Sequence, residues 1–350
     1  MNLYHLGHVP WLDSQLIYHA LPRLGMEGLI LLAPAEPYVC LGYHQDAEQE
    51  VDLAYCREQG IPVFRREVGG GTTYLDGQQL FYQLVIHKDN PLTPKDKSEF
   101  YRKFLAPVVQ TYRDLGVEAH YKPVNDIVTS EGCKISGNGV AEIGDYAVLV
   151  GNLIADFDYE TTVRVFRVPD AKFRDKVFKS LRENLTTLDR ELGQVPEWEA
   201  MIATLVRNFE IALGPLTPAA LPQAVHDQVA ELAQTHTTEE WLLKPGKRFC
   251  EGRKVRIAEG VEVVQRLHKA PGGLIRAIVE LQQGKIEAVG LSGDFFFYPA
   301  DRLADLEQLL SGLPLGEARR TIESFYWSHH IESPGVTPRD LAVALGAAEV

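Results

Sequence analysis

Three consecutive glycines, Gly69, Gly70 and Gly71, place the strongest constraint on how this chain folds. Glycine brings no side chain to a core, and it adopts backbone conformations that other residues avoid. The run therefore marks a sharp turn or a place where backbone lies against a ligand. Arg65 and Arg66, a few residues earlier, supply charge-assisted donors that suit an anion. Taken alone, a glycine run is more typical of a turn between strands.

A second segment, Lys134-Ile135-Ser136-Gly137, adds a positive charge followed by a small-residue turn. Neither segment has the spacing of a P-loop or of the glycine motif of dinucleotide-binding folds. Lysine, arginine and glycine backbone together suit a compound that carries both a phosphate and a carboxylate. The two segments therefore predict a site for such a compound.

Composition narrows the function classes. At 350 residues the chain is long enough for a large core, and we expect two domains. The net charge of -13 argues against broad binding of nucleic acid or anionic membranes, since both need a basic face. No apolar run approaches the roughly 20 residues of a membrane span, and residues 1–12 lack the features of a signal peptide. We expect a monomer in the cytoplasm.

The four cysteines, at positions 40, 56, 133 and 250, show neither CxxC spacing nor an accompanying histidine cluster. Zinc binding and a disulfide framework are therefore not expected. The pattern favours mostly buried free thiols in a reducing compartment.

Hydrophobic periodicity and turn residues predict an α+β arrangement, because sheet and helix alternate too irregularly for a doubly wound fold. Predicted helices span 11–24, 51–59, 99–115, 173–192, 198–213, 304–310 and 317–327; predicted strands span 28–33, 37–43, 61–64, 80–86, 126–129, 133–136, 146–150, 255–264, 273–281 and 286–291. The pattern changes after about Thr237. We expect a large mixed-sheet domain over residues 1–238 and a small α+β domain over residues 239–350.

Three stretches, in this order, resemble the lipoate–protein ligase family: RREVGGGTTYLD from Arg65, NDIVTSEGCKISG from Asn125 and SLRENLTTLDREL from Ser180. That family shares its fold with biotin protein ligases and octanoyltransferases. The resemblance extends less sharply to the family's C-terminal accessory domain, at Trp241, from Val261 and at Gly284-Lys285-Ile286. By resemblance, this domain assists adenylation and closes over the site.

The resemblance implies a two-step reaction. Lipoate attacks the α-phosphate of ATP to give lipoyl-AMP, and a lysine of an acceptor protein then takes the lipoyl group. Lys134 is implied as the catalytic residue, and Asp126 binds Mg²⁺ or a ribose. Residues implied in substrate or ATP binding are Arg66, Gly69, Gly70, Gly71, Thr72, Thr73, Tyr74, Asn125, Asp126, Ser136, Gly137 and Gly151. Asp126 capping a turn, Asn125 holding its loop and helix packing of the Ser180 stretch remain as alternatives.

The chain departs from the family pattern at two places. Leu75-Asp76 stands where the family has His-Asp, and Leu149-Val150 precedes Gly151 where histidines are frequent. The segment Gly77-Gln78-Gln79 replaces Leu-Gly-Asn. Thr73-Tyr74 together with Gln78-Gln79-Leu80 faintly resembles octanoyltransferases. These changes leave open whether lipoate or octanoate is preferred.

An ATP-independent acyltransferase on the same fold is the first alternative. It would need a cysteine nucleophile, and Cys133 is the candidate near Lys134. Neighbouring residues of a strand point to opposite faces, so we expect a buried Cys133 thiol instead. A biotin ligase lacks support because the GRGRxGR loop is absent. A non-enzymatic binding protein is the remaining alternative.

The resemblance implies a lipoyl-acceptor partner: glycine-cleavage H protein, an E2 lipoyl domain or a lipoate-binding protein of sulfur oxidation. Such acceptors are typically acidic, so a local basic surface is expected on this acidic chain. Candidate segments are Lys172, Arg174, Lys176, Lys179 and Arg182, and Lys247, Arg248, Arg253, Lys254 and Arg256. A solvated charged face is the alternative for each segment.

Overall fold

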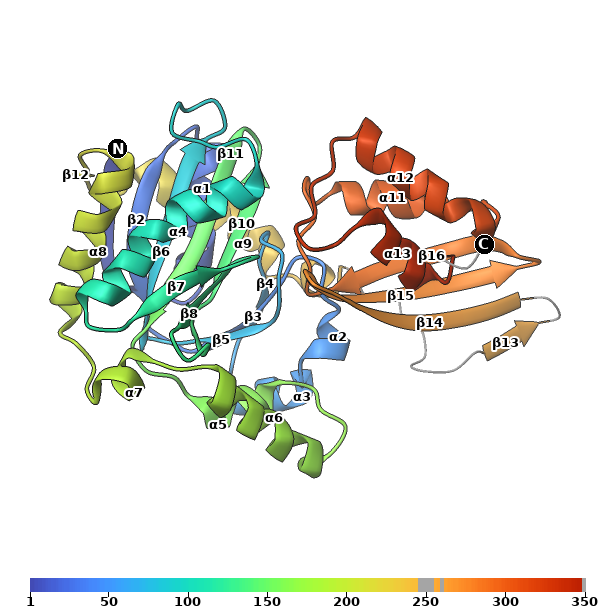
Figure 1. Cartoon of the computed structure of the whole chain (residues 1–350), viewed down its shortest axis with the longest axis horizontal. Coiled ribbons are helices and arrows are strands. Elements are labelled where there is room, and N and C mark those ends of the chain that lie inside the picture. Colours follow the sequence, from blue (N-terminus) through green and yellow to red (C-terminus); the bar gives the residue numbers. More distant parts are fainter. Residues whose placement is uncertain (245–254, 259–260, 348–350) are drawn as a thin grey trace. The chain divides into compact units, whose positions relative to one another are not determined.

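The computed structural model describes residues 1–244, 255–258 and 261–347, and it divides into two packed units (Figure 1). The first unit contains Met1–Cys40, Val51–Phe64 and Thr73–Trp241. The second contains Leu41–Glu50, Arg65–Thr72 and the described residues from Leu242 onward. The glycine loop thus packs with the C-terminal part of the chain, although it lies within the first quarter of the sequence.

The first unit is built on a mixed six-stranded sheet with the order β10-β11-β6-β2-β1-β12. Its strands are β1 (Asn2–Val9), β2 (Gly28–Pro34), β6 (Gln79–His87), β10 (Asn138–Ile143), β11 (Tyr146–Ile154) and β12 (Thr217–Pro218). β1 pairs in parallel with β2 and β12, whereas the other neighbours are antiparallel. This mixed sheet confirms the predicted fold class.

Helices cover both faces of this sheet (Figure 1). Consecutive side chains of β6 point to opposite faces. Gln83 bonds the carbonyl of Ser14 in α1 (Asp13–Arg23), whereas the ring of Tyr82 lies 5.9 Å from that of Phe209 in α8 (Trp198–Leu213). The helix α9 (Gln223–His236) packs on α1, and α4 (Lys97–Asp114) packs on α8. Because helices cover both faces of the sheet, nearly all of β6 is buried.

Two further three-stranded sheets belong largely to the first unit. One has the order β4-β3-β5, from β3 (Tyr38–Leu41), β4 (Val63–Arg65) and β5 (Thr73–Leu75). The other is an antiparallel meander of β7 (Ala119–Lys122), β8 (Asp126–Thr129) and β9 (Lys134–Ser136). The meander carries the second of the three family-like stretches, and its strands β8 and β9 confirm the predicted strands there.

Short helices connect these sheets: α2 (Ala47–Glu50), α3 (Leu53–Gln59), α5 (Tyr159–Val165), α6 (Ala171–Asn184), α7 (Leu188–Leu192) and α10 (Glu239–Leu242). The prediction of one helix over 173–192 is wrong, because the helix is broken at residues 185–187. There Thr187 caps α7 by accepting from the backbone N–H of Arg190. The backbone N–H of Thr186 leaves the helix to bond Lys134.

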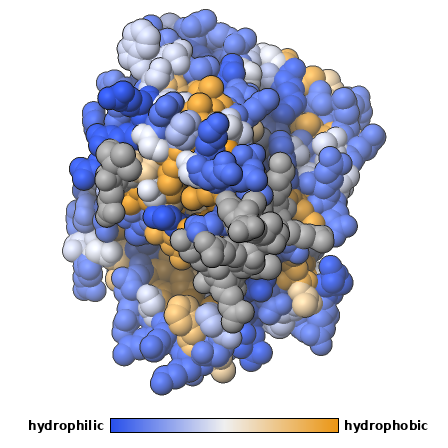
Figure 2. All heavy atoms as spheres, turned by 90° about the vertical axis from the view of Figure 1, so that its right-hand side faces the viewer, coloured by the Kyte–Doolittle hydropathy of each residue, from blue (hydrophilic) through white to orange (hydrophobic). Residues whose placement is uncertain are grey.

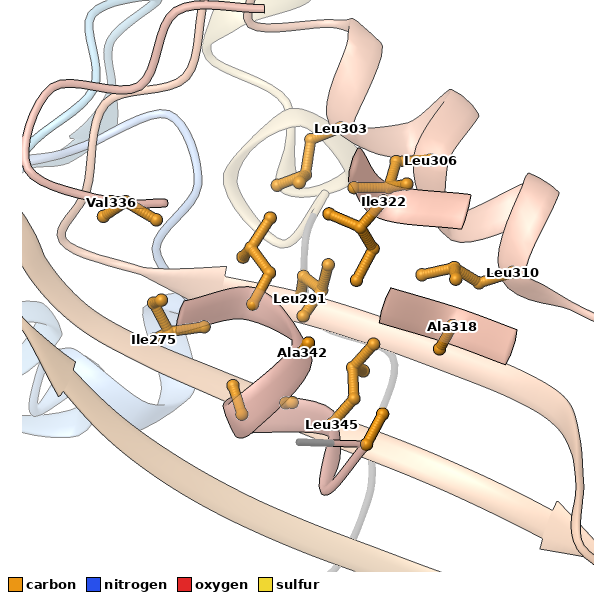
Figure 3. Packing of buried hydrophobic residues seen from close by; sticks show 14 of the residues in the cluster. Ile275, Leu291, Leu303, Leu306, Leu310, Ala318, Ile322, Val336, Ala342 and Leu345 are labelled. Atoms are coloured by element: carbon orange, nitrogen blue, oxygen red, sulfur yellow. The ribbon is translucent and has the colours of Figure 1, made fainter. Parts of the chain in front are cut away.

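The second unit has an antiparallel sheet in the order β13-β14-β15-β16, formed by β13 (Val255–Ala258), β14 (Val261–Ala270), β15 (Gly273–Gln282) and β16 (Lys285–Gly293). The predicted single strand over 255–264 is wrong, because those residues belong to two paired strands. The helices are α11 (Arg302–Leu310), α12 (Ala318–Ser328) and α13 (Pro338–Leu345), with a 3-10 turn at Leu315–Glu317. They bury one apolar core against the sheet, including Ile275, Leu291, Leu306, Ile322 and Leu345 (Figure 3).

Several elements of the first unit were not predicted, among them β1, β5, β7, β10, α5 and α9. β1 buries only Leu3 and Tyr4 fully, so its sequence shows little apolar alternation.

Much of the surface in Figure 2 is hydrophilic. Among the described residues, no helix has the length and apolar character needed to cross a membrane.

Candidate functional site

Lys134 and Asp126 meet on neighbouring strands of the small meander. Asp126 opens β8 and Lys134 opens β9, and the Lys134 Nζ lies 2.6 Å from the Asp126 Oδ1. The side chains are 37% and 33% exposed. The ammonium is therefore held by one carboxylate while remaining open to an anionic ligand from solvent. The structure brings these two predicted site residues together.

The backbone that carries Lys134 is fixed from three directions. Thr186 donates its N–H to the Lys134 carbonyl at 2.8 Å, and the Tyr112 hydroxyl donates to the Ile135 carbonyl at 2.7 Å. The Gly137 N–H donates to the Asn152 Oδ1 at 2.9 Å. Thr186 lies in the third family-like stretch, which thereby contacts the lysine strand directly. Tyr112 and Asn152 carry no signal in the sequence that could have identified them.

The predicted residues Ser136 and Gly151 belong to a buried polar network. The Ser136 hydroxyl donates to the Asn152 carbonyl at 2.6 Å, and the Tyr82 hydroxyl donates to the Asn138 Oδ1. A Cβ on Gly151 would lie 2.2 Å from the Asn138 Oδ1 and 2.4 Å from the Tyr82 hydroxyl oxygen. Gly151 therefore provides the space in which this pair forms. Burial raises the pKa of Tyr82, so its hydroxyl stays a neutral donor.

Asn125 holds its loop by reciprocal bonds with Asn138. Each side-chain amide donates to the other residue's backbone carbonyl, and the Asn138 bond measures 3.0 Å. This geometry agrees with the alternative in which Asn125 fixes the loop beside Asp126.

Arg66 donates hydrogen bonds to two carbonyls of the glycine loop, which belongs to the second unit. The Arg66 Nη2 donates to the carbonyls of Gly69 and Gly71 at 2.8 and 2.9 Å. Gly70 adopts a φ of +87°, which favours glycine, and its N–H donates to the Phe295 carbonyl at 3.3 Å. The Thr72 hydroxyl donates to the Gln45 Oε1 at 2.9 Å. These contacts give the loop a defined shape within its own unit.

Arg65 does not serve as an anion donor, in contrast to its interpretation from sequence. Its side chain is fully buried and donates to backbone carbonyls of the same unit. The acceptors are Gly42, Tyr43, Gln45 and Leu242, at 2.5 to 3.0 Å. Because a guanidinium carries five N–H groups in a fixed fork, it can hold several chain segments together. Arg65 therefore shapes the start of the glycine loop.

Thr73 and Tyr74 leave the loop on β5 in the first unit. The Thr73 hydroxyl bonds the Cys40 carbonyl at 3.4 Å. Tyr74 is buried, and burial together with the charge of Asp76 raises the pKa of its hydroxyl to about 12. The hydroxyl of Tyr74 therefore stays neutral, and the bond of Thr73 is to backbone of the same unit.

The cysteines partly contradict the sequence analysis. Cys40 and Cys56 are buried, as expected, but Cys133 is partly exposed. Its thiol donates to the Glu183 carbonyl at 3.3 Å. The expected burial of Cys133 is therefore wrong, because Cys133 precedes β9 and the alternation of side chains along a strand does not apply to it. Cys250 lies outside the described residues, as do Lys247, Arg248, Arg253 and Lys254.

Comparisons with known proteins agree with this fold. Residues 12–210 match the family model described as the lipoyl protein ligase A/B catalytic domain. The lipoate–protein ligase LplJ of Bacillus subtilis is 26% identical over 280 residues, covering 79% of this chain and 78% of the relative. The octanoyltransferase LipM of Kyrpidia tusciae is 25% identical over 227 residues, covering 59% of this chain and 82% of the relative.

A solved structure from Thermoplasma acidophilum, from a study of a bi-partite lipoate protein ligase and its E2 lipoyl domain, is also similar. It is 26% identical, has a TM-score of 0.62, and matches 71% of this chain and 98% of the solved chain. The mixed sheet with its lysine-bearing meander is thus that of an enzyme with the biotin/lipoate ligase fold. Since the family model spans more than half of its length, the chain belongs to the lipoyl protein ligase A/B catalytic domain family.

Proposed function

We propose that this protein is an ATP-dependent lipoate–protein ligase that works through lipoyl-AMP. The observation that carries the proposal is the Lys134 ammonium, held 2.6 Å from Asp126 on a strand whose backbone is fixed at Lys134, Ile135 and Gly137. Both steps of the reaction build up negative charge on oxygen. A cation held rigidly where that charge develops stabilises the transition state more than the ground state.

In the first step, a lipoate carboxylate oxygen attacks the α-phosphorus of ATP, and pyrophosphate leaves. This activation is required because a free carboxylate does not acylate an amine at a useful rate. In our proposal Lys134 binds the phosphoryl and carboxyl oxygens as charge moves onto them. Arg66 and the backbone of Gly69–Thr72, apart from the Gly70 N–H that bonds the Phe295 carbonyl, are proposed to bind the anionic part of the substrate.

In the second step, the ε-amine of an acceptor lysine attacks the acyl carbon of lipoyl-AMP. The amine loses a proton, AMP leaves, and an amide forms. The proposed acceptor is a lipoyl domain protein, and the similarity to a ligase studied with its E2 lipoyl domain supports that class. Lys134 stabilises the oxyanion of the tetrahedral intermediate in this step.

Asp126 fits a limited role in binding Mg²⁺. Its Oδ1 is engaged by Lys134, so a single carboxylate oxygen is left for a cation. Mg²⁺ commonly takes only one or two protein carboxylates and fills its remaining positions with phosphate oxygens and water. We therefore propose that Mg²⁺ arrives with the nucleotide and that Asp126 supplies one ligand at most.

An ATP-independent octanoyl or lipoyl transferase is the second candidate, because octanoyltransferases are among the similar proteins. The partly exposed Cys133 thiol, next to Lys134, is the observation that keeps it open. In that mechanism the thiolate would take the acyl group from a carrier, and no nucleotide would be consumed.

Lipoate-dependent exchange of pyrophosphate into ATP separates the two candidates. The ligase gives exchange with lipoate, ATP and pyrophosphate when no acceptor protein is present. Cys133→Ala retains this exchange, whereas Lys134→Gln loses it. A transferase gives no exchange and loses acyl transfer in Cys133→Ala. Exchange that is absent from the wild-type protein, with acyl transfer from a carrier present, would overturn the ligase proposal.

A further inference from the structure

Helix α6 presents a stripe of three lysines to solvent. Lys172, Lys176 and Lys179 are spaced by four and three residues, so they lie on one face of the helix, and all three are exposed. Within Ala171–Asn184, five basic residues outnumber Asp175 and Glu183, although the whole chain has a net charge of -13. We call Lys172, Lys176 and Lys179 the basic stripe.

The basic stripe is largely unpaired. Among the described residues, no carboxylate oxygen lies within 4.0 Å of the Lys172 or Lys176 ammonium. Lys179 has a loose contact with Glu183 at 3.8 Å, and both side chains are more than half exposed. Such an exposed pair contributes little to stability. The charges of the stripe are therefore available to a partner.

The side of α6 opposite the basic stripe packs on the rest of the first unit. The helix packs against α5 (Figure 1). The Arg182 guanidinium lies 5.5 Å from the centre of the Tyr159 ring. No residue of α6 is fully buried, so the helix projects from the surface. An amphipathic surface helix normally buries an apolar stripe. Here the half-buried Val177, Phe178 and Leu181 provide only a narrow support.

The C-terminal end of α6 leads directly to Lys134. The backbone carbonyl of Glu183, in the last turn, accepts a hydrogen bond from the Cys133 thiol at 3.3 Å. Leu185 and Thr186 follow, and Leu185 forms a β-bridge with Lys134 while Thr186 bonds the Lys134 carbonyl at 2.8 Å. A protein that binds along the helix and reaches its C-terminal end would therefore lie beside the strand that carries the lysine.

We propose that the basic stripe of α6 is the docking surface for an acidic face of the protein that receives the acyl group. This inference rests on the proposed function, because it assumes a protein acceptor. Charge complementarity selects an acidic partner, and it steers diffusional encounter more than it strengthens the final complex. The chain's own negative charge repels acidic proteins elsewhere, so a local basic stripe directs them to the helix whose C-terminal end adjoins Lys134.

The experiment compares two charge reversals of equal size. Lys172→Glu with Lys176→Glu alters the stripe, and Lys95→Glu with Arg102→Glu alters two exposed residues elsewhere on the first unit. Each protein is assayed for lipoate-dependent ATP–pyrophosphate exchange, for transfer to hydroxylamine, and for kcat and KM with an E2 lipoyl domain of net negative charge. Lys172→Arg with Lys176→Arg tests whether charge alone suffices.

We expect the stripe reversal to raise the KM for the lipoyl domain by about tenfold at low salt. The exchange, the hydroxylamine reaction and kcat should stay within about twofold of wild type, and added salt should shrink the difference. The control reversal and the arginine variant should behave as wild type. An unchanged KM overturns the inference, and so does an equal loss of exchange, which would place a nucleotide on α6. Failure of exchange in the wild-type protein would instead refute the ligase proposal.

Discussion

Lys134→Gln separates catalytic from structural roles of the lysine. The Lys134 and Asp126 side chains are each about one third exposed, so their ion pair contributes at most about 1 kcal/mol to folding. Loss of a rigid electrostatic donor typically lowers kcat by about 10² to 10³-fold, or roughly 3 to 4 kcal/mol of transition-state stabilisation. We therefore expect activity to fall far more than stability.

Lys88→Gln is a matched control. The Lys88 Nζ lies 2.9 Å from a carboxylate oxygen of Glu142, and its side chain is 37% exposed, as is that of Lys134. Both variants lose one ion pair of a half-buried lysine, but only Lys134 lies at the proposed site. The assays are ATP–pyrophosphate exchange, transfer to a lipoyl domain and urea unfolding. If Lys134→Gln keeps kcat within threefold, or if Lys88→Gln loses as much activity, the assigned role of Lys134 is refuted.

Two further predictions concern buried groups. Gly151→Ala should lower the unfolding free energy by about 2 to 4 kcal/mol in urea, because its Cβ overlaps Asn138 and Tyr82 and disrupts their bond; a change below about 0.5 kcal/mol would contradict this. Burial, with Arg65 and Lys244 adding to the effect, lowers the pKa of His44 to about 3, below its unfolded value of 6.5. The unfolded chain therefore binds the proton first, and stability falls as the pH drops below 6.5, by about 2 kcal/mol at pH 5. His44→Gln should remove this part of the pH dependence, and an unchanged dependence would show that other groups cause it.

Local patterns predicted much of the fold. The helix over residues 198–213 has the predicted bounds, because its apolar spacing is regular and Gly214 follows it. The strands β2, β6 and β15 also follow from short apolar runs between turn residues. Lys134 and Asp126 are adjacent because β8 and β9 pair as neighbours in a meander, which the short connection between them favours.

Contacts between distant segments were not predictable. Thr186 reaches the Lys134 carbonyl only because the helix breaks at 185–187, and its sequence continues an amphipathic pattern through that point. Tyr112 lies in the last turn of α4, and its hydroxyl bonds the Ile135 carbonyl. A tyrosine in the apolar face of a helix is typical of a core residue. Nothing in the local sequence distinguishes it from a tyrosine whose hydroxyl bonds the strand of a functional site.

The three glycines have different roles, although the sequence presents them as one motif. A Cβ on Gly69 would lie 2.9 Å from the Phe295 carbonyl oxygen, and one on Gly70 would lie 3.0 Å from the Phe296 ring. On Gly71 the nearest atom, the Cβ of Asp294, is at 3.7 Å, an ordinary contact. Gly69 and Gly70 are therefore required already by packing within the second unit. At Gly71 the described structure leaves room for a Cβ, so packing does not require glycine there.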